Sequence, residues 1–217
     1  MSRGSFFLSD QLGDYVFAHN SPEDAVLAAL AAETAQMPEA MMQSGRAVGL
    51  LLQVLTRMAG ATDAVEVGTF TGYSSICIAR ALAPGGTLRC FDVSETYTDV
   101  ARRYWADAGL DDRIELTIGP AIDGLRALPT EPTIDVAYVD ADKGGYISYF
   151  DEIVPRLRPG GVLVADNTLF SGAVVDASRT DDSSEGIRRF NDHVLTDERV
   201  DVAYLTVSDG VTICQKR

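Results

Sequence analysis

The sequence has 217 residues, with 32 acidic and 18 basic side chains and a formal net charge of −14. Nucleic acids and anionic membrane surfaces both attract lysine and arginine, so the acidic balance argues against either partner. Hydrophobic residues make up 46% and charged residues 23%, which is typical of a globular chain and not of a disordered one. We expect one domain over residues 1–217.

Cysteine usage and the absence of targeting patterns favour a soluble, cytoplasmic protein. Cys77, Cys90 and Cys214 are scattered, and no CxxC or Cys/His cluster predicts a disulfide framework or a zinc site. No basic segment followed by an apolar one indicates a signal peptide. No apolar run reaches the roughly 20 residues that a membrane helix needs.

The first sixty residues predict two helices. Residues 21–33 begin with Ser21 as the expected N-cap and Pro22 in the first turn. Residues 46–58 form a second, apolar helix. We therefore expect an N-terminal helical segment over 1–60, followed by a binding core over 61–217.

From residue 64 strands and helices alternate. The predicted strands are 64–68, 87–92, 113–119, 134–142 and 161–167, and the predicted helices are 73–83, 95–109, 121–128, 145–157 and 184–197. A hairpin turning at Asp209-Gly210 closes the chain. This order predicts an α/β fold with a doubly wound, mostly parallel sheet and an antiparallel C-terminal strand. Ligands bind such sheets beyond the carboxyl ends of the strands.

The loop after the first strand of the core contains Gly68 and Gly72 in a GxxxG spacing. The dinucleotide fingerprint GxGxxG has a further glycine that lets the backbone meet a pyrophosphate, and here Thr69 and Phe70 stand in its place. The loop therefore favours a nucleoside ligand such as S-adenosylmethionine. Asp92 ends the next strand, where an acid accepts hydrogen bonds from ribose hydroxyls. The alternative is an ordinary strand-to-helix turn, in which glycine is common.

Oxygen-bearing side chains follow the next two strands. If these strands are neighbours, Asp140, Asp166 and Asn167 meet at one edge of the sheet and offer a hard, all-oxygen set suited to Mg²⁺, Mn²⁺ or Ca²⁺. The alternative is that they are caps or solvated loop charges. Lys143, three residues after Asp140, is either a general base or an ordinary surface lysine.

The segments EVGTFTGYS, FDVSE, GPA, VDADK, ADNTLFSGAVV and DGVTIC occur in this order, and over residues 40–217 the chain resembles the cation-dependent O-methyltransferases, the caffeoyl-CoA and catechol group with its bacterial relatives. The resemblance implies a Rossmann-like sheet and a homodimer. It also implies transfer of a methyl group from S-adenosylmethionine to one hydroxyl of a vicinal diol on a small aromatic acceptor.

The resemblance also implies roles for single residues. Asp140, Asp166 and Asn167 match the metal ligands, and Lys143 matches the base that works beside Asp140. The positions that match or adjoin cofactor contacts are Ser44, Glu66, Gly68, Thr69, Gly72, Ser74, Asp92, Ala121 and Asp140. Phe170 stands where many members carry a tryptophan beside the substrate. Tyr146 follows the metal loop and lies either against the acceptor or in the core.

Three features limit the acceptor and the alternatives. Residues 1–24 contain one arginine and no lysine, which disfavours a coenzyme A thioester because the plant enzymes hold that group with basic residues near the N-terminus. An NAD-dependent dehydrogenase on a similar fold is disfavoured by the missing glycine. A non-catalytic cofactor-binding module is disfavoured by the complete set of Asp140, Lys143, Asp166 and Asn167.

Overall fold

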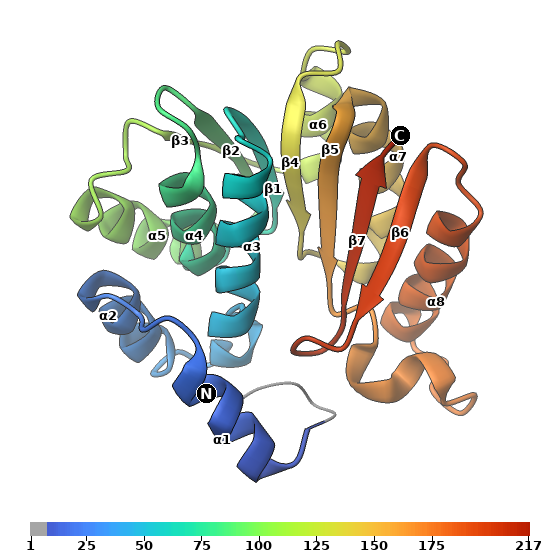
Figure 1. Cartoon of the computed structure of the whole chain (residues 1–217), viewed down its shortest axis with the longest axis horizontal. Coiled ribbons are helices and arrows are strands. Elements are labelled where there is room, and N and C mark those ends of the chain that lie inside the picture. The colour runs from blue at the N-terminus through green and yellow to red at the C-terminus, as the bar shows by residue number, and fades with distance from the viewer. Residues whose placement is uncertain (1–7) are drawn as a thin grey trace.

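Seven strands form one sheet, which Figure 1 shows between two layers of helices. The computed structural model describes residues 8–217, and Arg3, the one arginine of the N-terminal segment, lies outside them. The strands are β1 (Asp63–Val67), β2 (Thr87–Asp92), β3 (Ile114–Ile118), β4 (Ile134–Val139), β5 (Leu157–Asp166), β6 (Val200–Leu205) and β7 (Val211–Lys216). Their order is β3-β2-β1-β4-β5-β7-β6. The strands β1 to β5 are parallel, and β7 is antiparallel to both β5 and β6. The predicted fold class is confirmed.

The helices are α1 (Asp10–His19), α2 (Ala25–Thr34), α3 (Arg46–Met58), α4 (Tyr73–Ala81), α5 (Glu95–Asp107), α6 (Ala121–Ala127), α7 (Tyr146–Arg156) and α8 (Asp182–Leu195). Short 3₁₀ turns cover Ala40–Met42, Lys143–Gly145 and Phe170–Val175. Alternate strand residues face opposite layers, as a pleated strand requires. Tyr138 packs among α2 to α5, whereas its neighbour Val139 packs among α6 to α8.

The N-terminal region differs from the expectation in two ways. The first predicted helix begins at Ala25, because Asp24 and not Ser21 is its N-cap: Asp24 Oδ1 accepts the N–H groups of Val26 and Leu27. Helix α1 was not predicted. Its single buried residue is Gly13, so it lacks the apolar stripe by which a sequence pattern indicates a packed helix.

The carboxyl ends of the parallel strands and the turn between β6 and β7 share one edge of the sheet. Asp166, the last residue of β5, is paired with Val211, the first of β7. The antiparallel strand therefore brings residues 206–210 to the edge where ligands bind in such folds. Across the described part of the chain, no helix has the length and apolar character that crossing a membrane requires.

Candidate active site

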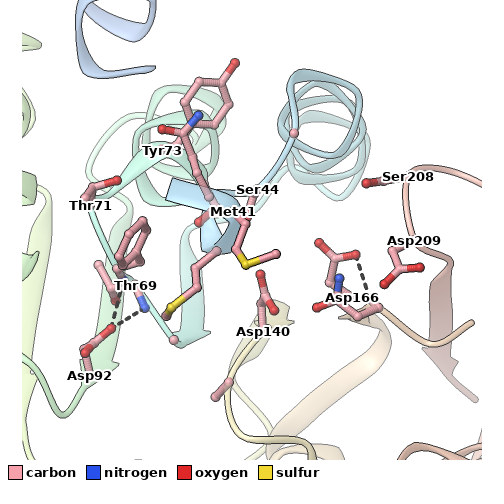
Figure 2. A pocket seen from close by; sticks show the side chains of 18 of the residues that line it. Met41, Ser44, Thr69, Thr71, Tyr73, Asp92, Asp140, Asp166, Ser208 and Asp209 are labelled. Atoms are coloured by element: carbon pink, nitrogen blue, oxygen red, sulfur yellow. Dashed lines mark hydrogen bonds between the residues drawn. The ribbon is translucent and has the colours of Figure 1, made fainter. Parts of the chain in front are cut away.

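A cavity of about 1150 Å³ lies at this edge, and Figure 2 shows it from close by. Most of the predicted site residues line it: Ser44, Gly68, Thr69, Ser74, Asp92, Ala121, Asp140, Lys143, Asp166, Asn167 and Phe170. In Figure 2, Asp92 and Thr69 lie at one end, Asp166 and Asp209 at the other, and Asp140 between them. The cavity thus joins the glycine loop to the oxygen cluster.

Gly68 is required by the approach of a neighbouring strand. Its φ is +88°, and a Cβ atom at this position would lie 1.9 Å from the carbonyl oxygen of Asp140. The Asp140 N–H donates to the carbonyl of Val67 at 2.8 Å. A side chain at residue 68 would therefore push apart the ends of β1 and β4, which carry the two halves of the site.

Asp92 anchors the glycine loop. Its Oδ2 accepts the N–H groups of Thr69 and Phe70, each at 2.8 Å, and its Oδ1 accepts the N–H of Ser94 at 2.8 Å. Figure 2 draws the bond to Thr69. The carboxylate still lines the cavity, and its remaining lone pairs can accept from a ligand hydroxyl. The loop-anchoring role was not foreseen from the sequence.

Two of the predicted cofactor residues, Glu66 and Gly72, are not among the residues that line the cavity. Glu66 is fully buried and accepts a hydrogen bond from the thiol of Cys90 at 3.3 Å, and burial raises the pKa of its carboxyl to about 8. A Cβ atom at Gly72 would lie 2.7 Å from the Cβ of Ala101 and 2.8 Å from Nε1 of Trp105. Gly72 therefore lets α4 begin close against α5.

The predicted oxygen cluster is assembled. Lys143 Nζ donates to Asp140 Oδ1 at 3.0 Å and to Asn167 Oδ1 at 2.8 Å. The hydroxyl of Tyr138 donates to Asp166 Oδ2 at 2.8 Å and lies 3.4 Å from Asp140 Oδ2. Burial, and secondarily the charge of Asp140, raises the pKa of Asp166 to about 7. Two carboxylates and an amide oxygen thus share one buried corner in which a positive charge is favoured.

The donor set fits a hard cation. Within residues 8–217 no group of three His, Cys, Asp or Glu side chains is arranged to hold a metal ion, so an ion would also need the amide oxygen of Asn167 and oxygens from outside the chain. Asn167 has a φ of +57°, a left-handed conformation that asparagine tolerates well. Its N–H donates to Asp166 Oδ1 at 2.7 Å, which fixes the two residues relative to each other.

Tyr146 lies beneath the oxygen cluster. It is fully buried and does not line the cavity. Its hydroxyl accepts from Lys143 Nζ at 2.7 Å and donates to the carbonyl of Asp166 at 3.1 Å. Of the two readings offered by the sequence, the structure therefore places Tyr146 in the core, where it supports Lys143. Phe170 remains at the cavity wall.

Sequence reasoning missed Tyr138 and two residues of the last turn. Tyr138 is two residues before Asp140, so strand alternation gives both side chains the same face, and that spacing was a usable signal. The Oγ of Ser44 lies 3.0 Å from the Tyr138 hydroxyl, which connects the loop before α3 to the oxygen cluster. Ser208 and Asp209 also line the cavity; the sequence pattern marked Asp209 as part of a hairpin turn but gave neither residue a place in the site.

Comparison with known proteins assigns the family. Residues 18–217 match the family described as O-methyltransferase. A probable caffeoyl-CoA O-methyltransferase 2 from Dictyostelium discoideum is 38% identical over 171 residues, covering 77% of this chain and 72% of the relative. The catechol O-methyltransferase domain-containing protein 1 of Mus musculus is 31% identical over 208 residues, covering 94% and 79%.

Solved structures agree with this assignment. An O-methyltransferase from Bacillus cereus in complex with SAH has a TM-score of 0.87 and 32% identity, covering 95% of this chain and 97% of that one. The O-methyltransferase TomG from Streptomyces achromogenes, in complex with SAM, has a TM-score of 0.85 and 31% identity, covering 95% and 96%. This chain belongs to the O-methyltransferase family.

Proposed function

We propose that this protein is an S-adenosylmethionine-dependent, divalent-cation-dependent O-methyltransferase that methylates one hydroxyl of a small vicinal dihydroxy aromatic acceptor. The observation that carries the proposal is the single cavity that joins the glycine loop and Asp92 to the cluster of Asp140, Asp166, Asn167 and Lys143. Methyl transfer needs the acceptor oxygen held close to the methyl group of the donor and in line with the bond that breaks. Placement of that kind supplies much of the rate.

The glycine-loop end suits the nucleoside of the cofactor. Asp92 lies at the end of β2 with its carboxylate fixed by three backbone N–H groups, which positions it for ribose hydroxyls. Ser74 and Ala121 line the same cavity from the starts of α4 and α6. The two structural neighbours named above hold SAH and SAM, which supports the same ligand here.

The oxygen end suits the metal and the acceptor. Asp140, Asp166 and Asn167 would hold an Mg²⁺-type cation, which when bound orients adjacent hydroxyls and lowers the pKa of the one that reacts. Lys143 is the base, because its Nζ lies within hydrogen-bond distance of two of the three proposed ligands and so beside the acceptor oxygen. Tyr146 positions this amine from below through a 2.7 Å contact. Phe170 lines the cavity beside the acceptor.

We also propose that the protein is a homodimer.

The test is methyl transfer from labelled S-adenosylmethionine to a catechol and to the matching mono-phenol, with and without EDTA. Turnover of the catechol should stop in EDTA and return with Mg²⁺ or Mn²⁺. The mono-phenol offers one oxygen instead of two and should be a poor acceptor. Full activity in EDTA, or equal rates on both acceptors, would contradict cation-assisted chemistry. Cofactor binding without turnover of any phenol would instead indicate a non-catalytic binding module.

A further inference from the structure

The charges on the cavity wall are unbalanced. Six of the described lining residues carry a carboxyl group and two carry a cationic group, Arg46 and Lys143. The acids are Glu23, Asp92, Asp140, Asp142, Asp166 and Asp209. An acceptor with a carboxylate or phosphate would be desolvated here and would need a cation as its partner. Whether such a cation is free therefore decides which acceptors fit.

Both cations are already engaged by the protein. Lys143 Nζ lies within hydrogen-bond distance of three protein groups, those of Asp140, Tyr146 and Asn167, at 2.7–3.0 Å. Arg46 donates from Nε to the carbonyl of Ser21 at 3.1 Å and from Nη2 to the carbonyl of Asn20 at 2.9 Å.

The same guanidinium lies 4.5 Å from the ring centroid of Phe17. Arg46 therefore ties the chain after α1 to the start of α3. Of the two cationic side chains on the described cavity wall, Lys143 is therefore the one that lies in the oxygen cluster, whereas Arg46 is held against the chain between α1 and α2 by the carbonyls of Asn20 and Ser21.

Asp209 is a fixed negative charge beside the oxygen cluster. The N–H of Ser171 donates to its Oδ1, and the hydroxyl of Ser171 lies 3.3 Å from the same atom. The N–H of Leu169 donates to the carbonyl of Asp209 at 3.1 Å. The turn also fits closely, since a Cβ atom at Gly210 would lie 2.4 Å from Cγ of Leu169. Figure 2 shows Asp209 on the same side of the cavity as Asp166.

The second carboxylate oxygen of Asp209, Oδ2, has no hydrogen-bond partner within the described chain, and the residue is half-buried on the cavity wall. A divalent cation at Asp140 and Asp166 would offset the charges of those two residues. It would leave Asp209 uncompensated.

We infer that the site selects acceptors with no anionic group, and that Asp209 imposes this selection by favouring a cationic or uncharged ring substituent. The inference rests on the proposed catechol methylation. Its physical basis is that a fixed charge at a binding site attracts one sign of ligand and repels the other. Coenzyme A thioesters, with their phosphates, would be excluded for the same reason.

The experiment compares three catechols under saturating Mg²⁺ and cofactor. Their substituents at position 4 of the catechol ring are an ethylammonium chain, a methyl group and a propanoate chain: 2-(3,4-dihydroxyphenyl)ethylamine, 4-methylcatechol and 3-(3,4-dihydroxyphenyl)propanoate. We expect kcat/KM to fall in that order, with most of the difference in KM. Asp209→Asn keeps an oxygen for Ser171 and removes the charge, so the ammonium-to-carboxylate ratio should shrink about fivefold, the upper scale of one partly exposed ion pair. Raising the salt concentration should shrink the wild-type ratio as well.

Asp112→Asn is the matched control, because Asp112 is exposed and lies before the amino end of β3, away from the cavity. It removes the same charge and should leave the acceptor ratio unchanged. Equal or better use of the carboxylate by the wild type, or an unchanged ratio in Asp209→Asn, would overturn the inference while leaving the methyltransferase proposal intact. No methylation of any of the three catechols would overturn both.

Discussion

The hydroxyl of Tyr138 donates to Asp166 Oδ2 at 2.8 Å, inside the fully buried part of β4 and β5. It joins two neighbouring strands at the point where the proposed metal ligands begin. The same hydroxyl lies 3.0 Å from Ser44 Oγ on the other side. One side chain thus connects the N-terminal segment to the oxygen cluster, and its removal should be measurable.

Tyr138→Phe should lower the free energy of unfolding by about 1–3 kcal/mol, because it leaves a buried carboxylate oxygen without its donor. Urea denaturation would measure the change. Tyr204→Phe is the control, since the Tyr204 hydroxyl bonds to the carbonyl of Asn191 at an exposed site. Tyr204→Phe should lower the free energy of unfolding by no more than about 0.5 kcal/mol. Equal losses in the two variants would contradict the bridging role of Tyr138.

Asp92→Ala should weaken binding of S-adenosylhomocysteine by roughly 1.5–3 kcal/mol, the scale of a hydrogen bond to a charged group. The variant should also loosen the glycine loop, because Thr69 and Phe70 lose their acceptor. Calorimetry would measure affinity, and hydrogen exchange of these two amides would report the loop. Asp123→Ala, at an exposed position in α6, is the control. An unchanged affinity would refute the assignment of Asp92 to the ribose.

Much of the fold and the oxygen cluster could be predicted because both follow from strand order. Parallel strands that alternate with helices place their carboxyl ends on one edge, and β4 and β5 are neighbours there. Asp140 and Asp166 therefore had to approach each other. Gly68 was correctly placed in the loop, although the sequence did not show that the carbonyl of Asp140 presses on it.

The missed features depend on contacts between segments far apart in the chain. Asp209 reaches the site because β7 inserts antiparallel beside β5, and no local pattern gives that register. Glu66 and Cys90, on neighbouring strands, face the same side of the sheet under α4. Glu66 matches a cofactor position of the family motif, but this burial keeps it off the cavity wall. Phe17 lines the cavity from α1, the helix that the sequence pattern did not predict.

Glu66 should make stability depend on pH. Burial raises the pKa of its carboxyl from 4.5 to about 8 in the folded protein. Below about pH 4.5 the group is protonated in both states, and its contribution to stability is fully present. As pH rises from 4.5 to 8 the unfolded chain loses the proton while the folded chain retains it, so wild-type stability falls.

Glu66→Gln carries no titrating proton and should not show that fall. The difference in unfolding free energy between this variant and the wild type should shift by at least about 1 kcal/mol in favour of the variant between pH 5 and pH 8, since one pKa unit is about 1.36 kcal/mol. Denaturation at several pH values would measure the shift. Glu131→Gln is the control at an exposed position, and its unfolding free energy should change with pH in the same way as that of the wild type. Parallel curves for Glu66→Gln would show that Glu66 is ionised in the folded state.

Lys143→Ala should bind cofactor normally and slow the chemical step by about 10²–10⁴-fold, the usual share of a general base. The loss should shrink as pH rises, because a catechol that ionises in solution no longer needs a base. Single-turnover rates across pH 7 to 10 would measure it. Lys216→Ala, at the end of β7, is the control. A loss that stays constant with pH would assign Lys143 a purely structural role.

The proposed homodimer has a concrete basis in α1. Leu12, Tyr15 and Phe17 on this helix are 48%, 59% and 45% exposed, and exposed apolar patches of this kind mark interaction surfaces. Figure 1 shows α1 outside the layered core.

Light scattering at micromolar concentration should give about twice 23.3 kDa. Leu12→Glu should reduce the mass to that of one chain, because a charge in a desolvated interface is costly. Leu195→Glu places the same charge at an exposed leucine at the end of α8 and should leave the dimer intact. A wild-type mass of one chain would contradict the proposal, and a dimeric Leu12→Glu variant would move the interface away from α1.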